Sequence, residues 1–251
     1  MSASEIPKDL FFVESIYSPI EGNGAVVTLL STENEEEVIT RSFMPEQLQM
    51  KNHRGSIREG WYAYYYEGNK TPFGYGNLDA YARRQFRNYY ELRDSLSANV
   101  IDARSEEAIV PNVFLDVNGP LQVLSYHVNV GHGNCSFILL MAGDFYHLWL
   151  VDCSIVDKVD HCRDYQANIE ECLKGIRQRI ELMEQQHLHI DRFFLTHAHH
   201  DHYSGVEYLV NNHFIDKRTI CYVNLYYQMA SKAYNRMLIA LKNAGVRIMS
   251  H

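Results

Sequence analysis

The chain has 251 residues, of which 46% are hydrophobic and 22% are charged, so it can build one large domain or two small ones. No stretch approaches the run of about 20 apolar residues that a membrane-spanning helix needs, and the start of the chain lacks the basic and apolar regions of a secretory signal. We therefore expect a cytoplasmic protein without a membrane segment. The net charge of −8 excludes a whole-molecule attraction to nucleic acid, although a local basic strip can still hold phosphates.

Charge and histidine are distributed unevenly along the chain. Residues 1–120 carry 11 Lys and Arg against 18 Asp and Glu, whereas residues 121–251 carry 12 against 13. Only His53 precedes residue 121, and the other twelve histidines follow it. We therefore expect the chemistry in the second half.

The five cysteines are scattered and odd in number, and no two of them form a CxxC pair. This pattern argues against a disulfide framework and against a thiolate zinc finger. We expect reduced thiols, with Cys135, Cys153 and Cys221 buried as small hydrophobic residues because they lie in apolar, strand-like runs.

The first part of the chain alternates short apolar runs with turn signals, which predicts a small β-rich α+β domain over residues 1–115. The predicted strands are 10–16, 25–30, 38–43 and 61–66. Residues 77–96 contain no Pro and no Gly, and their apolar residues recur at helical intervals, which predicts one long helix.

Arginines and tyrosines alternate on this predicted helix, and two interpretations remain open. Arg83, Arg84 and Arg87 beside the tyrosines can form a surface for nucleic acid. The simpler interpretation is an amphipathic helix whose aromatic rings enter the core.

Turn signals between Pro111 and Pro120 predict a boundary, after which strands alternate with helices. This alternation is typical of an α/β layered domain, here over residues 121–251. The predicted strands are 121–130, 136–141, 146–151, 190–195, 219–225 and 246–249, and the predicted helices are 162–186, 202–211 and 230–243.

An apolar strand leads directly into the sequence His197-Ala198-His199-His200-Asp201-His202. On an extended backbone His197 and His199 point the same way, so both imidazoles can bind one ion, and His200 points away. Asp201 and His202 can then reach a second ion about 3.5 to 4 Å away. Such ions lower the pKa of water from near 16 towards about 7, and the metal-bound hydroxide is a nucleophile at neutral pH.

The run Thr196 to His202 followed by Gly205 resembles the HxHxDH motif of the metallo-β-lactamase superfamily. The resemblance implies an αββα layered fold, a first metal on His197 and His199, and a second on Asp201 and His202. Asp201 and His202 are also the residues to which we assign catalysis. The same resemblance implies that Asp152, which closes a strand, orients the metal loop from behind the ligands.

Residues 128–138 look like the opening hairpin of the branch that includes the hydrolase domain of DNA-uptake competence proteins. That branch has a glutamine at the position of His132, which here is either an active-site residue or a turn residue between two glycines. The resemblance implies further ligands from the second half of the fold, so the domain is expected to be partial. A longer parent protein or a partner chain would supply those ligands, and His251 is a candidate for one of them.

We therefore expect a zinc-dependent hydrolase with one or two ions, or with manganese or iron at the same ligands. The preferred substrate is the phosphodiester bond of nucleic acid, by analogy with the competence branch. The alternatives are hydrolysis of a small ester or thioester, and a non-catalytic metal-binding or assembly module that lacks the second half of the active site.

Overall fold

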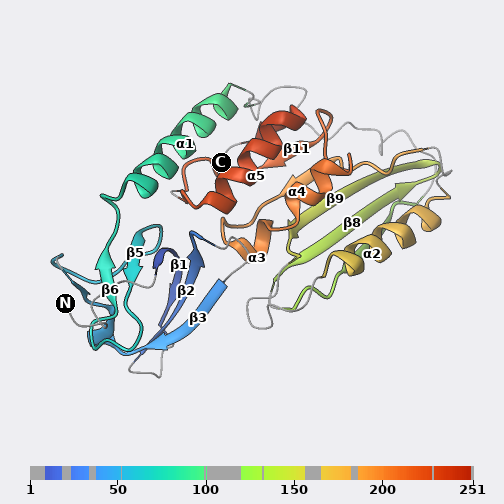
Figure 1. Cartoon of the computed structure of the whole chain (residues 1–251). Coiled ribbons are helices and arrows are strands. Elements are labelled where there is room, and N and C mark those ends of the chain that lie inside the picture. The colour runs from blue at the N-terminus through green and yellow to red at the C-terminus, as the bar shows by residue number, and fades with distance from the viewer. Residues whose placement is uncertain are drawn as a thin grey trace. The chain divides into compact units, whose positions relative to one another are not determined.

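The computed structural model separates into two compact units (Figure 1). The first unit comprises Met1–Tyr90 and Gln228–Asn235, and the second comprises Glu91–Tyr227 and Arg236–His251. The structure describes residues 9–18, 24–33, 38–51, 53–98, 100, 120–131, 133–155, 165–181, 186–227 and 229–249. The predicted boundary between Pro111 and Pro120 therefore lies almost entirely outside the described residues.

The first unit is built on a mixed sheet with the strand order β3-β2-β1-β5-β6-β4. All neighbouring strands are antiparallel except β4 and β6, which are parallel. The strands are β1 (Asp9–Tyr17), β2 (Ala25–Ser31), β3 (Val38–Phe43), β4 (Met50–Lys51), β5 (Tyr62–Tyr65) and β6 (Phe73–Tyr75), with a short 3-10 helix at Pro45–Leu48. The four strands predicted from the sequence are confirmed, and β4 and β6 were missed because two or three residues are too few to show an alternating pattern.

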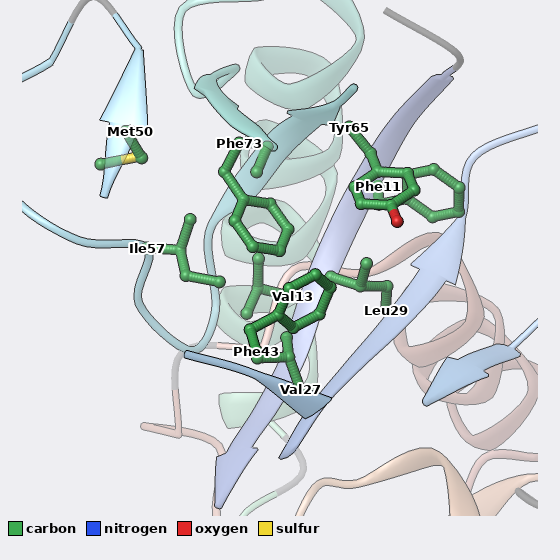
Figure 2. Packing of buried hydrophobic residues seen from close by; sticks show 10 residues of the cluster. Phe11, Val13, Val27, Leu29, Phe43, Met50, Ile57, Tyr65 and Phe73 are labelled. Atoms are coloured by element: carbon green, nitrogen blue, oxygen red, sulfur yellow. The ribbon is translucent and has the colours of Figure 1, made fainter. Parts of the chain in front are cut away.

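Aromatic and branched side chains from these strands form the core of the first unit (Figure 2). Phe43 packs edge-on against Phe73 with ring centroids 4.9 Å apart, and Phe11 meets Tyr65 in the same way at 5.9 Å. Edge-to-face contacts of this kind stabilise a core beyond the area they bury. Trp61 and Tyr75 pack partly buried at its border.

Helix α1 (Ala80–Ser97) is amphipathic, as the simpler interpretation predicted. Tyr89 is only 1% exposed, whereas Arg83, Arg84 and Arg87 are exposed. The ring of Tyr89 lies 6.4 Å from that of Tyr234, which belongs to the returning segment of the same unit.

The second unit contains a mixed sheet whose strands follow the order of the sequence, from β7 to β12. β7, β8 and β9 form an antiparallel meander, and β9, β10, β11 and β12 are parallel. The strands are β7 (Gln122–His127), β8 (Cys135–Ala142), β9 (Phe145–Cys153), β10 (Arg192–Phe194), β11 (Ile220–Tyr222) and β12 (Arg247–Met249). Because parallel neighbours need crossover connections, helices join the last four strands and the class is mixed α/β.

The helices after β9 are α2 (Gln166–Arg179), α3 (His200–Tyr203), α4 (Val206–Asn211) and α5 (Lys232–Ala244). The single helix predicted over residues 202–211 is wrong in one respect, since the chain breaks between α3 and α4. The break occurs because the N–H of Gly205 donates to the carbonyl of Cys153, 2.8 Å away, and not to a helical carbonyl.

Cys135, Cys153 and Cys221 are buried free thiols, as predicted. Burial raises the pKa of the Cys221 thiol well above its ordinary value. In the described part of the chain, no helix combines the length and hydrophobicity that crossing a bilayer requires.

Candidate metal centre

The predicted metal loop lies at one edge of the second sheet. Because β9 and β10 are parallel, Asp152 near the end of β9 and Thr196 just after β10 meet at the same edge. β7 also runs parallel to these strands, so the turn between β7 and β8 reaches that edge. Asn134 in this turn donates its side-chain N–H to Asp152 across 3.0 Å, and its backbone N–H to the carbonyl of Asp201 across 3.1 Å.

Asp152 anchors the loop from beneath. The residue is fully buried, and its backbone has a positive φ of 53°. Its Oδ1 accepts the backbone N–H of Thr196 at 2.8 Å, and its Oδ2 accepts the Thr196 hydroxyl at 2.7 Å. Burial by itself raises the pKa of the Asp152 carboxyl, but the hydrogen bonds from His202 and Thr196 outweigh it and hold the pKa below its ordinary value. Asp152 is therefore an ionised acceptor at neutral pH.

The ionised Asp152 determines which nitrogen of His202 carries a proton. Nδ1 of His202 lies 2.8 Å from Oδ2 of Asp152, and an ionised carboxylate can only accept, so Nδ1 donates. In the neutral imidazole the lone pair is then on Nε2. Nε2 of His202 lies 3.8 Å from Oδ2 of Asp201, so two ligand-type atoms are close together.

The same reasoning extends to His197 through Thr196. The Thr196 hydroxyl gives its proton to Asp152, so its oxygen can accept from Nδ1 of His197, which is 3.1 Å away. Neutral His197 would then also have its lone pair on Nε2. One buried carboxylate therefore orients two imidazoles, directly in one case and through a hydroxyl in the other.

The imidazole rings of the loop gather in one place. The ring centroid of His197 lies 3.7 Å from that of His202 and 4.6 Å from that of His199. Nε2 of His199 and Oδ1 of Asp201 are buried atoms. His200 is buried and its ring packs edge-on against Tyr203, with centroids 5.5 Å apart.

Two glycines allow the surrounding segments to approach this loop. A Cβ at Gly133 would lie 2.4 Å from the Ser154 side chain and 2.8 Å from the Asp201 carbonyl, and one at Gly205 would lie 2.5 Å from the sulfur of Cys153. All three distances are shorter than real Cβ contacts. The glycines thus belong to the architecture of the site.

The four predicted ligands fit a zinc ion by the chemistry of their donor atoms, since three imidazoles and one carboxylate are zinc ligands in proteins. The rings of the three histidines lie near one another, with centroids 3.7 and 4.6 Å apart. Within the described ranges, however, no three His, Cys, Asp or Glu side chains converge as a group that could hold a metal. His132 and His251, the other two candidates, lie outside the described residues.

Asn134 and Thr196 are the site residues whose roles the sequence did not reveal. Both act through hydrogen bonds to Asp152, which is 18 residues from one and 44 from the other. The available signal was their position, since Asn134 directly follows Gly133 and Thr196 directly precedes His197.

No model of a known protein family matches this chain, and no curated protein matches it either.

Proposed function

We propose that the second unit is a metal-dependent hydrolase domain of the metallo-β-lactamase type, part of an αββα layered fold. His197 and His199 would hold a first zinc ion, and Asp201 and His202 a second, with manganese or iron as other occupants. The observation that carries the proposal is the hydrogen-bond chain from Asp152. With Asp152 ionised, Nδ1 of His202 donates to its carboxylate and Nδ1 of His197 can donate to the Thr196 hydroxyl, which would leave the Nε2 lone pairs of both rings for a metal.

A bound ion would supply a nucleophile at neutral pH by lowering the pKa of water, and would stabilise negative charge in the transition state. The chain's own contribution is orientation. Asp152 holds Thr196 and His202 in place, and Asn134 ties the β7–β8 turn to both Asp152 and Asp201. Asp201 and His202 are the residues we assign to the reacting centre.

The preferred substrate is a phosphodiester of nucleic acid. This choice of substrate is supported by the resemblance of residues 128–138 to the competence branch. The resemblance is one of sequence, and the geometry of the site does not enter it. Small esters and thioesters would be hydrolysed by the same chemistry, so the substrate must be tested directly.

Metal content per chain, measured by elemental analysis of the purified protein, tests the ligand set. We expect about one or two ions per chain in the wild type and a loss of most of them in the double variant His197→Ala, His199→Ala. The matched control is His213→Ala, because His213 is an exposed histidine outside the loop. Metal contents near zero in the wild type would overturn the proposal.

Hydrolysis of bis(p-nitrophenyl) phosphate and of single-stranded DNA, with zinc, manganese or iron added, tests the reaction. Cleavage that the double variant has lost would support the hydrolase. Bound metal without cleavage of either phosphodiester or of p-nitrophenyl acetate would instead support a non-catalytic metal-binding module.

A further inference from the structure

A basic hairpin in the first unit carries exposed charge beside aromatic rings. Residues 51–58 include Lys51, His53, Arg54 and Arg58 and no acidic residue, although residues 1–120 as a whole are acidic. The hairpin is held by backbone hydrogen bonds from Met50 to Gly55 and from Ile57 to Leu48, and by the bridge between Gln49 and Ser56. His53, Arg54 and Arg58 are all exposed.

Three aromatic rings meet at this hairpin. The imidazole of His53 stacks on the ring of Tyr75 with centroids 4.4 Å apart and planes at 26°, and Trp61 meets both rings edge-on at 5.5 and 5.4 Å. Trp61 and Tyr75 are half-buried against the core, whereas His53 is exposed. The stack therefore has a fixed inner end at Tyr75 and a solvent end at His53.

The charge beside the rings is positive. The guanidinium of Arg58 lies 5.4 Å from the centre of the Trp61 ring, a cation–π distance. The following residue, Glu59, is an exposed acid whose carboxylate accepts the backbone N–H of Ile16 at 2.7 Å, and the cations of the hairpin outnumber it. Cations for phosphates and flat rings for bases thus occur at one place.

We infer that His53, Trp61 and Tyr75 with Arg54 and Arg58 form a binding surface for single-stranded nucleic acid. An unpaired base can stack on the exposed ring of His53, which Tyr75 and Trp61 support, and the arginines can hold the adjacent phosphates. A duplex offers no unstacked base, and a phosphopeptide needs the cations but not the rings, so neither uses the whole surface. The inference rests on the proposed function in one respect: single-stranded nucleic acid would be the substrate class of the proposed hydrolase.

The test is fluorescence anisotropy of a labelled oligothymidylate of about 15 nucleotides, a length within the site size of single-strand-binding modules, with the full chain. Chelator is present throughout, so that binding is measured without cleavage. We expect the double variant His53→Ala, Arg58→Ala to bind about tenfold more weakly than the wild type. Both substituted side chains are exposed, and circular dichroism checks that the variant is folded.

The matched control is Arg41→Ala. Arg41 also lies over a tyrosine, Tyr65, at 5.8 Å, but that ring belongs to the core and the guanidinium is paired with Glu67. We expect the Arg41→Ala variant to bind the oligothymidylate with the affinity of the wild type. No binding by the wild type, an equal loss in the control, or equal binding of a duplex or heparin would overturn the inference.

The variant His197→Ala, His199→Ala separates the two proposals. If it binds the oligonucleotide normally, the surface stands whether or not the hydrolase proposal does. If wild-type protein binds metal and cleaves phosphodiesters but the His53→Ala, Arg58→Ala variant binds oligonucleotide unchanged, only the surface is wrong.

Discussion

Single residues carry the organisation of the candidate metal centre. Asp152 accepts hydrogen bonds from the backbone and side chain of Thr196, from Asn134 and from His202, although it would itself be a ligand of no ion. Groups that orient metal ligands in this way contribute to metal affinity, because they set the tautomer and direction of each imidazole.

Thr196→Val tests the hydroxyl link. Valine keeps the branched shape and the backbone N–H but cannot accept from His197, so we expect zinc affinity to fall by about tenfold or more in a competition assay with a chelating dye. Thr196→Ser retains the hydroxyl and should bind zinc nearly as the wild type does. Equal affinities of the valine and serine variants would contradict the role of the hydroxyl.

His189 is a second buried histidine, eight residues before the first histidine of the metal loop. Neither of its ring nitrogens has a hydrogen-bond partner among the described residues, and Asp216 is 3.7 Å from Nδ1. Burial lowers the pKa of His189 below its ordinary value of 6.5, more than Asp191 and Asp216 raise it. The folded chain therefore resists protonation that the unfolded chain accepts.

The sign of the resulting pH dependence follows from proton uptake. Below pH 6.5 the unfolded chain binds a proton at His189 before the folded chain does, so acidification lowers the free energy of unfolding through this residue. We expect acidification to lower the free energy of unfolding, measured by urea denaturation, by less in the His189→Leu variant than in the wild type. Exposed His187 supplies the control, since His187→Leu should lose stability in parallel with the wild type.

At the scale of elements, the break between α3 and α4 places the loop against β9. Gly205 has an ordinary negative φ of −89°, so its backbone conformation does not require glycine. Glycine is needed here because there is no room for a side chain. Its N–H donates to the carbonyl of Cys153, and a Cβ at this position would lie 2.5 Å from the sulfur and 3.2 Å from the carbonyl oxygen of that residue. A larger residue would push the metal loop away from the strand.

Gly205→Ala should reduce the free energy of unfolding by about 1–3 kcal/mol, the usual cost of overpacking a close contact. Gly175→Ala is the matched control. Gly175 lies inside α2, and a Cβ there would meet nothing within 4 Å, so alanine should stabilise the helix by about 0.5–1 kcal/mol. Urea unfolding of the two variants should thus shift in opposite directions, and equal shifts would contradict the argument.

At the scale of the whole molecule, the first unit is completed by a segment from late in the chain. Residues 228–235 belong to it by their contacts. The hydroxyl of Tyr62 donates to the carbonyl of Ala230 at 2.8 Å, and the side chain of Asn235 donates to the backbone and the side chain of Gln85, each at 3.0 Å. The unit is therefore not a continuous stretch of sequence.

Asn235→Ala tests this closure. The substitution removes the two buried hydrogen bonds from the Asn235 side chain to Gln85, and we expect a loss of about 1–3 kcal/mol in the free energy of unfolding. Asn243→Ala removes an exposed asparagine from the same helix and should change the free energy of unfolding by less than about 0.5 kcal/mol. Similar values for the two variants would mean that the returning segment adds little to the first unit.

The sequence by itself determined the features that depend on near neighbours. Alternating and helical periods predicted most strands and helices, and the ligand types within six residues predicted the candidate metal loop, because these signals are local. Only the tertiary structure decided what depends on distant residues: the hydrogen bonds of Asp152 to Asn134, Thr196 and His202, the break at Gly205, and the return of residues 228–235 to the first unit. The pairing register of the strands brings such residues together. That register cannot be read from the composition of one sequence or from the spacing of its residues.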